Sequence, residues 1–263
     1  MPEPLTMPIS ERVICQGERA TVDATGLYYR ELNQLLKALV DAGATDVTVR
    51  NVRGQRYIGT NLQQPVRIEI EGVPGNDLGA FLDGPDIICS GDAQDGCGNT
   101  MNSGRLIING SAGDILGHSM RGGSIYVRWN VGYRVGIHMK EFGDARPVIV
   151  IGGTAQHFLG EYMAGGLLIV LGRQLAPEEM HAARFIGTGM HGGVMYVRGR
   201  VDERFLGKEV GVANLTAEDQ MVLCRHVREY GRIFGVDVDG LLVGPFVKLY
   251  PKTGRPYGRL YAY

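Results

Sequence analysis

The sequence predicts a mainly β protein that folds as a single-stranded β-helix, a solenoid in which each copy of a repeat forms one turn. Three observations carry this prediction: 40 of the 263 residues are glycine, one motif recurs about every nineteen residues, and each copy contains a short apolar run. Glycine is used at roughly twice its average frequency of about 7%, as expected where a chain needs many tight turns. Collagen is excluded, because the glycines follow no Gly-X-Y period and only 11 residues are proline.

The repeat has the frame G-x-A-x-x-x-x-G-x-x-M-x-x-G-x-(I/L)-x-(I/V)-x, which is clearest from Gly91 and again from Gly110. Within a copy, runs such as 106–108 and 125–127 read as short strands with one face turned inward. A period near nineteen is too short for a helix-turn-helix repeat and lacks the Leu/Asn frame of leucine-rich repeats. About seven copies cover residues 53–200, so we expect about seven stacked turns.

Stacking places equivalent positions of successive copies above one another, so a shared position becomes a ladder. One such position holds residues that we expect to point inward: Leu82, Met101, Met120, Met139, Met163 and Met190. Another holds glycines at which a Cβ would obstruct the backbone: Gly98, Gly117, Gly136 and Gly160. A column of sulfur atoms could carry a soft metal, but thioethers are also good filler for a narrow core, so we interpret both ladders as structural.

The N-terminal segment, residues 1–52, is expected to form a helix-strand cap. Thr25 is the predicted N-cap of a helix that stops at Gly43, and residues 46–49 form a short strand that leads into the solenoid. The solenoid, residues 53–200, belongs with both ends to one integrated domain.

The C-terminal segment, residues 201–263, is expected to begin with a helix. Thr216 and Asp219 resemble a capping box, and an apolar stripe follows to Phe234. Such end segments can cover the open strand edges that a solenoid would otherwise expose.

The tail from residue 244 onward interleaves aromatic and basic side chains. This pattern is compatible with nucleic-acid binding, with packing over the chain's own domain, or with docking to a partner protein, since Tyr and Arg are enriched in interface hot spots. The candidate docking residues are Phe246, Tyr250, Arg255, Tyr257 and Arg259.

Charge and cysteine content exclude several classes. Lys plus Arg total 27 against 28 for Asp plus Glu, so the net charge of -1 gives no general case for nucleic acid or an anionic membrane as partner. The four cysteines form no CxxC pair and are expected to be reduced thiols. No apolar run approaches the length of about 18 residues that a spanning helix needs, and residues 1–20 lack the apolar core of a signal peptide. We expect a cytoplasmic protein.

Catalytic signatures are weak. No two of the six histidines have metal-ligand spacing, and their repeat positions differ, so stacking is not expected to gather them. A Ser-His-Asp catalytic triad could be assembled from Ser119, His138 and Asp114, but no GxSxG motif supports this assignment. Asp95 and Asp114 share a repeat position with Asn76, where they could form a catalytic carboxylate column or cap backbone turns.

One glycine-rich run matches the dinucleotide-binding fingerprint but lacks its structural context. The GTGMHG run at 187–192 matches G-x-G-x-x-G, but the residues after it read as a strand where a dinucleotide site needs a helix. The sequence therefore predicts no catalytic, cofactor-binding or metal site within this chain.

The repeat frame resembles the GXGXG domain at the C-terminal end of the glutamate synthase large subunit. The segment DATGLYYRELN at 23–33 resembles the entry to the stand-alone version of that domain, which accompanies an amidotransferase-like subunit and an FMN-binding synthase subunit. The resemblance covers about residues 20–200. It implies a right-handed β-helix that acts as a non-catalytic scaffold, with FMN and an iron-sulfur cluster held by a partner subunit.

The resemblance leaves the reaction of the complex open. Glutamate synthase and N-methylglutamate synthase share the three-part plan. A similar β-helix forms one of the subunits of formylmethanofuran dehydrogenase and of the formyltransferase/hydrolase complex, although the repeats there are usually cleaner. The remaining alternative is a free-standing β-helix enzyme that acts on carbohydrate.

Overall fold

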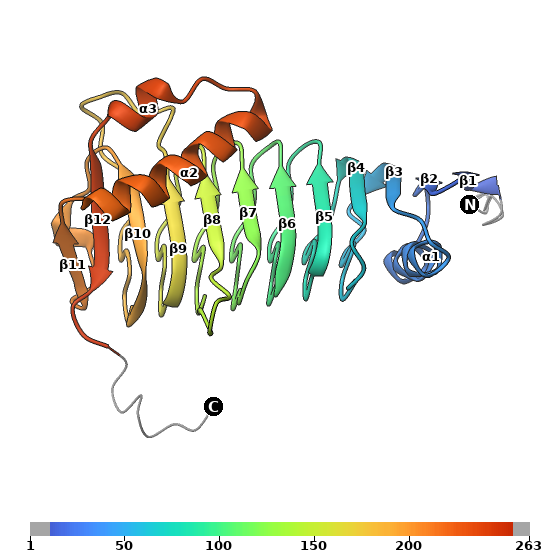
Figure 1. Cartoon of the computed structure of the whole chain (residues 1–263), viewed down its shortest axis with the longest axis horizontal. Coiled ribbons are helices and arrows are strands. Elements are labelled where there is room, and N and C mark those ends of the chain that lie inside the picture. The colour runs from blue at the N-terminus through green and yellow to red at the C-terminus, as the bar shows by residue number, and fades with distance from the viewer. Residues whose placement is uncertain (1–10, 255–263) are drawn as a thin grey trace, which may run out of the picture.

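The structure is a computed structural model that describes residues 11–254, and these residues form one continuous sheet with three α-helices (Figure 1). The spatial order of the strands is β1-β2-β3-β4-β5-β6-β7-β8-β9-β10-β12-β11. The strands are β1 Val13–Gln16, β2 Arg19–Asp23, β3 Asp46–Arg53, β4 Arg67–Val73, β5 Asp83–Cys89, β6 Ser103–Ile108, β7 Ser124–Val127, β8 Val148–Ile151, β9 Ala164–Val170, β10 Gly192–Arg198, β11 Val210–Ala213 and β12 Phe246–Pro251. The helices are α1 Tyr29–Asp41, α2 Ala217–Phe234 and α3 Asp239–Val243, with a 3-10 turn at Glu203–Phe205.

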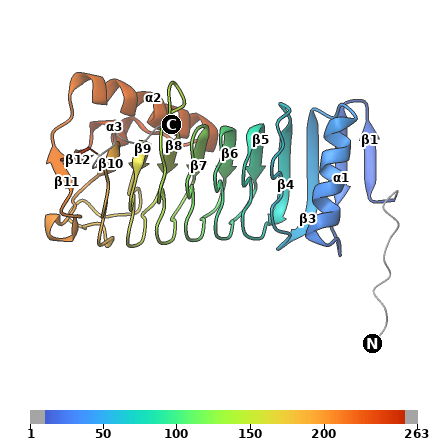
Figure 2. The same cartoon turned by 90° about the horizontal axis from the view of Figure 1, so that it is seen from below.

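Strands β2 to β10 pair in parallel with their neighbours in sequence, which confirms the predicted β-solenoid. The register stacks one apolar position of each copy on the next: Ile87 pairs with Leu106, and Leu106 with Ile125. The solenoid has about six turns where about seven were expected. The reason is geometric. The repeat copies supply the consecutive strands β4 to β10, and each turn runs from one strand to the next, so the number of turns is one less than the number of strands (Figure 2).

The interior is filled by the predicted inward ladder. All six of its members are completely buried in one continuous apolar core: Leu82, Met101, Met120, Met139, Met163 and Met190. The four glycines of the second ladder have left-handed φ values near +70°, between +66° and +71°. A Cβ on Gly117 would lie 2.4 Å from Cδ1 of Ile149, so this turn needs glycine for its conformation and for space.

The N-terminal cap is a β2-α1-β3 crossover whose helix enters the solenoid core through Leu32, Leu36 and Val40. Thr25 is not the N-cap, so that prediction is wrong. Thr25 donates from both its backbone N–H and its hydroxyl to the Asp23 carboxylate, at 2.9 and 2.7 Å, and so belongs to a preceding turn. The N-cap is Tyr28, whose N–H donates to the Glu31 carboxylate at 2.9 Å.

The C-terminal helix α2 begins as predicted. The Thr216 hydroxyl accepts from the Asp219 N–H at 3.2 Å, and the Asp219 carboxylate accepts from the Thr216 N–H at 2.8 Å. Gly235, with φ of +62°, ends the helix in the left-handed conformation. Figure 1 shows that α2 crosses the outer face of the strands, and the edge of β10 is covered by β12 of the same C-terminal segment.

The two ends of the sheet are formed by antiparallel strands. At the N-terminal end β1 pairs with β2, and at the other end β12 pairs with both β10 and β11. No helix within residues 11–254 combines the length and the hydropathy that crossing a bilayer requires.

Candidate functional site

Helix α2 lies on the outer face of the solenoid over a second apolar cluster. Leu223, Val227, Tyr230 and Phe234 of α2 pack against outward side chains of strands β6 to β10. Tyr126 is one of these outward side chains and is only 3% exposed. Strands 106–108 and 125–127 are therefore buried on both faces, where the sequence predicted one inward face.

Tyr230 ties the helix to the turns beneath it. Its hydroxyl donates to the backbone carbonyl of Arg128 at 2.8 Å and accepts from Nη1 of Arg173 at 2.9 Å. A Cβ on Gly152 would come within 2.2 Å of that carbonyl, so a glycine makes this close approach possible.

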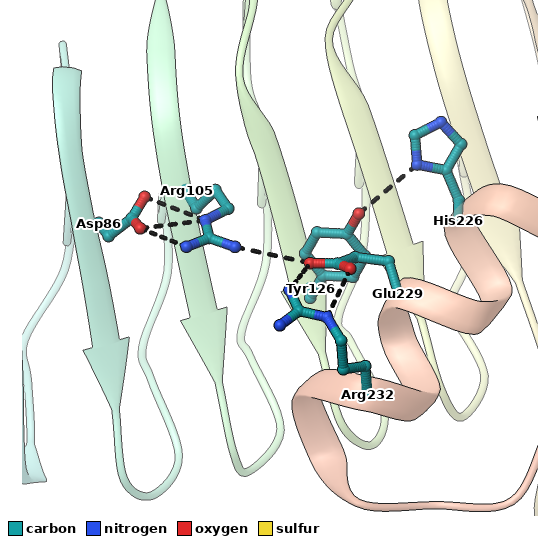
Figure 3. A network of polar contacts seen from close by, with 6 residues as sticks. All are labelled: Asp86, Arg105, Tyr126, His226, Glu229 and Arg232. Carbon is teal, nitrogen blue, oxygen red and sulfur yellow. Dashed lines mark hydrogen bonds and ion pairs between the residues drawn. The ribbon is translucent and has the colours of Figure 1, made fainter.

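A polar network borders the apolar contact, as Figure 3 shows. Arg105 of β6 donates from Nε to both carboxylate oxygens of Asp86 on β5, at 3.1 Å each, and its Nη1 lies 3.5 Å from Glu229 of α2. Arg232, one turn further along α2, donates to Glu229 from Nε at 2.9 Å. The network thus links two adjacent turns of the solenoid to one face of α2.

Tyr126 and His226 complete this network. The Tyr126 hydroxyl lies 3.5 Å from Nδ1 of His226. Burial raises the pKa of Tyr126 to about 12, and burial together with the charge of Arg225 lowers the pKa of His226. Both side chains are therefore neutral at pH 7, which suits a half-buried contact between a helix and a sheet.

The start of α2 is held by a second polar cluster around Asp219. Nζ of Lys248 on β12 lies 2.8 Å from each Asp219 carboxylate oxygen, and the Tyr196 hydroxyl of β10 donates to the same group. Burial alone would raise the pKa of Asp219, but hydrogen bonds from Lys248, Tyr196 and Thr216 lower it well below its usual range. Three segments far apart in sequence therefore share one ionised carboxylate.

The carboxylates of the turns hold the backbone of the next turn. Oδ1 of Asp95 accepts from the N–H of Asp114 at 2.8 Å, and Oδ1 of Asp114 accepts from the N–H of Tyr133 at 2.8 Å. Asn130 holds Thr154 in the same way. The shared position is thus a ladder of backbone caps, and Asp114 lies in no triad with Ser119 and His138.

Two histidines do come together, which corrects the expectation that stacking would not gather them. The rings of His118 and His138 lie 6.1 Å apart in an edge-to-face arrangement. Oγ of Ser119 lies 3.4 Å from Nε2 of His118, whose Nδ1 lies 3.2 Å from Oδ1 of Asn99. Burial and the neighbouring His138 lower the pKa of His118. No sequence spacing indicated this pairing, because an edge-to-face contact can join different positions of adjacent turns.

The described part of the basic and aromatic tail is a strand of the sheet. Phe246 begins β12 and packs against the α2 cluster, and Tyr250 lies near the other end of β12 with 37% of its surface exposed. Arg255, Tyr257 and Arg259, the other candidate docking residues, lie outside the described residues. The two described candidates therefore differ, since Phe246 contacts its own chain and Tyr250 retains an exposed ring.

The outer side of α2 leaves apolar surface uncovered. Met221 of α2 is 68% exposed and Val243 of α3 is 89% exposed. Between these helices lies a cavity of about 610 Å³, whose lining includes Cys224 and Arg228.

Other candidate chemistry is limited in residues 11–254. No group of three or more His, Cys, Asp or Glu side chains is placed to hold a metal ion within this range. Burial raises the pKa of Cys89 to about 11, so this thiol is protonated at neutral pH. Strand β10 begins at Gly192, the last residue of the GTGMHG run, which confirms that this run leads into a strand and forms no dinucleotide fingerprint.

Comparisons with known proteins agree with this architecture. An uncharacterized protein of Methanocaldococcus jannaschii is 46% identical over 252 residues, which cover 93% of this chain and 97% of the relative. A chain of the formyltransferase/hydrolase complex of Methylorubrum extorquens, solved in complex with methylofuran, is similar in fold. Its TM-score is 0.60 and its sequence identity 18%, over 88% of this chain and 90% of that chain.

The family model described as the GXGXG motif matches residues 42–252. The match includes every turn of the solenoid, helix α2 and strand β12. The chain therefore belongs to the GXGXG motif family, the family of the glutamate synthase C-terminal domain.

Proposed function

We propose that this protein is a non-catalytic scaffold subunit of a glutamate-synthase-type complex. Its partners in this proposal are an FMN-binding synthase-like subunit and a glutamine amidotransferase-like subunit, which act together in the cytoplasm on glutamate or N-methylglutamate synthesis. The observation that carries the proposal is the GXGXG match over residues 42–252, which covers the whole solenoid.

The packing of the solenoid supports a mechanical role. The methionine ladder is completely buried, and the parallel strands are in register from turn to turn. Each buried ladder side chain stabilises the stack by roughly 1.5–3 kcal/mol. A stack of this kind resists bending and can hold two partner subunits at a fixed separation.

The polar groups of the turns support the same interpretation. Asp95 and Asp114, which a carbohydrate-cleaving β-helix would use as its acid and base, accept hydrogen bonds from the backbone of the next turn. In this proposal FMN and the iron-sulfur cluster belong to the synthase-like partner, and this chain binds neither.

The test is purification of the complex under native conditions from the source cells, through an affinity tag on this chain. We expect co-purification of a flavin-containing synthase-like protein and an amidotransferase-like protein. The isolated chain should have no visible absorbance from flavin or iron. Tightly bound flavin in the isolated chain would contradict the scaffold role.

The same experiment decides between the alternatives. The similarity in fold to a chain of the formyltransferase/hydrolase complex makes a formyl-processing complex the second candidate. An amidohydrolase-like partner, or a partner that contains molybdenum or tungsten, would select it. Turnover of a carbohydrate by the isolated chain, lost in Asp95→Asn or Asp114→Asn, would contradict both scaffold proposals.

A further inference from the structure

A groove of about 430 Å³ crosses several turns of the solenoid where each chain segment approaches its next strand. We call it the turn groove. Its lining includes six polar side chains: Ser119, Arg121, His138, Lys140, Tyr162 and His191. The volume exceeds that of a single oxyanion and falls in the usual range for small-molecule sites, about 300–1,000 Å³.

The solenoid repeat brings the two permanent cations of the turn groove together. Arg121 follows Met120 of the buried ladder, and Lys140 follows Met139, so the two cations occupy the same position in adjacent turns. The backbone N–H of Lys140 donates to the carbonyl of Met120 at 3.0 Å, which fixes this stacking. Adjacent turns are separated by about 4.8 Å, so the two cations can reach different oxygens of one ligand.

No carboxylate of the described chain neutralises these cations. Arg121 and Lys140 are both exposed, and neither has an ion-pair partner among residues 11–254. The acidic residues of nearby turns have other partners, since Glu161 pairs with Arg134 and Glu141 lies 3.5 Å from Arg146. The lining of the groove contains no Asp or Glu in this part of the chain.

The aromatic rings of the groove stack on one another. His138 and Tyr162 are parallel, with ring centroids 5.4 Å apart and planes 8° from parallel. The next turn leaves room for Tyr162 only because it has Gly189 there, where a Cβ would lie 2.4 Å from the ring. The rings of His118 and His138 meet in a T-shaped contact. The stacked contact occupies one face of each of the His138 and Tyr162 rings.

The groups that line the groove are predominantly hydrogen-bond donors. The Arg121 guanidinium and the Lys140 ammonium are donors only, and the Tyr162 hydroxyl can donate, whereas the Ser119 hydroxyl is directed at Nε2 of His118. His191 directs Nδ1 at the carbonyl of Gly189, at 3.1 Å, so the proton on that nitrogen is not available to a ligand in the groove. Two unpaired cations beside a further donor suit a ligand with several negatively charged oxygens.

We propose that the turn groove binds a small organic anion that carries phosphate or carboxylate groups. The two stacked cations contact its charged oxygens, and the Tyr162 hydroxyl adds a hydrogen bond. Neither contact requires a partner subunit, because all of these side chains come from this chain.

The test is isothermal titration calorimetry of the full chain at low ionic strength. Pyrophosphate serves as the phosphate probe and citrate as the carboxylate probe. The probe that binds with the higher affinity identifies the anionic group that the groove prefers. We expect saturable binding of at least one probe near one site per chain, weakened by added salt. The variant Arg121→Ala/Lys140→Ala should bind at least about tenfold more weakly, because it loses two charge-assisted contacts.

A matched control removes the same two charges elsewhere. Arg53 and Lys37 lie near the N-terminal end of the sheet and are also exposed, so Arg53→Ala/Lys37→Ala should retain wild-type affinity. Both double variants should keep a melting temperature close to that of the wild type, because all four side chains are on the surface and the exposed ion pair of Lys37 with Asp41 contributes little to stability.

Three results would overturn the proposal: no saturable binding of either probe, equal weakening by both double variants, or unchanged affinity in Arg121→Ala/Lys140→Ala. Capture of partner subunits is measured separately on the same variants. If only capture is lost while the wild-type chain binds neither probe, the groove is an acidic-protein contact and the proposal is wrong. Failure of the scaffold proposal would leave the calorimetric result unchanged.

Discussion

Substitution of Gly117 by alanine should destabilise the solenoid through two separable effects. The first is conformational, because φ at Gly117 is +67° and an L-residue there costs about 1–2 kcal/mol. The second is steric, because the new Cβ would lie 2.4 Å from Cδ1 of Ile149. Carbon atoms in contact are about 3.5–4.0 Å apart, so the Ile149 side chain must move within a closed core, at about 1–3 kcal/mol. The total is about 2–5 kcal/mol.

The assay is urea unfolding, followed by the fluorescence of Trp129, the single tryptophan. Gly143→Ala is the matched control, since Gly143 also has a left-handed φ, +57°, but its added Cβ would meet nothing within 4 Å. The control should lose only the conformational part, about 1–2 kcal/mol.

A second-site variant tests the steric part directly. Ile149→Val removes Cδ1 and by itself costs about 0.5–1.5 kcal/mol. In Gly117→Ala/Ile149→Val the nearest remaining atom, Cγ1, is at 3.5 Å, an ordinary contact. The double variant should therefore be more stable than the sum of the single changes by about 1–3 kcal/mol. The reasoning is refuted if Gly117→Ala costs no more than Gly143→Ala, or if the two changes are additive.

Three further predictions address the core, the α2 contact and acid stability. Met120→Asp would place a charge at a completely buried position, so we expect no soluble folded protein, and a folded variant by circular dichroism would show that this ladder faces solvent. Tyr230→Phe removes the hydroxyl that joins α2 to the turns beneath it, which should cost about 1–3 kcal/mol in urea unfolding; an unchanged midpoint would contradict this. Burial opposes ionisation of Asp219, but the Lys248 ammonium and other donors lower its pKa overall, so this group stabilises the fold above its unfolded pKa of about 3.9 and less as the pH falls. Asp219→Asn should therefore unfold more easily at pH 7 and lose less stability between pH 7 and pH 3, and equal pH dependence in both proteins would contradict the assignment.

The sequence predicted the buried positions of the solenoid correctly, but it predicted the start of only one of the two terminal helices. The buried positions of Met101 and Met120 followed from the repeat, because pairing in register converts a constant sequence spacing into a column. The start of α2 at Thr216 followed from local capping chemistry. Thr25 lacks an acidic residue three positions later and donates to Asp23, whereas Tyr28 has Glu31 at that spacing, so the helix begins later.

The residues of the turn groove were harder to predict from the sequence than the solenoid was. Arg121 and Lys140 carry no motif, and their significance comes from the absence of a carboxylate opposite them in the described chain, which no spacing rule predicts. The gathering of His118 and His138 likewise depends on ring orientation between adjacent turns.

The sequence by itself determined the repeat, the inward ladder and the glycine positions, because each depends on neighbours one turn away. Only the tertiary structure decided that α2 lies over the outer face of the strands and that β12 inserts between β10 and β11. Contacts such as that between Tyr126 and His226 join residues 100 positions apart. An amphipathic helix specifies that one of its faces must be buried, but several apolar surfaces can bury it, and the choice depends on packing across the whole chain.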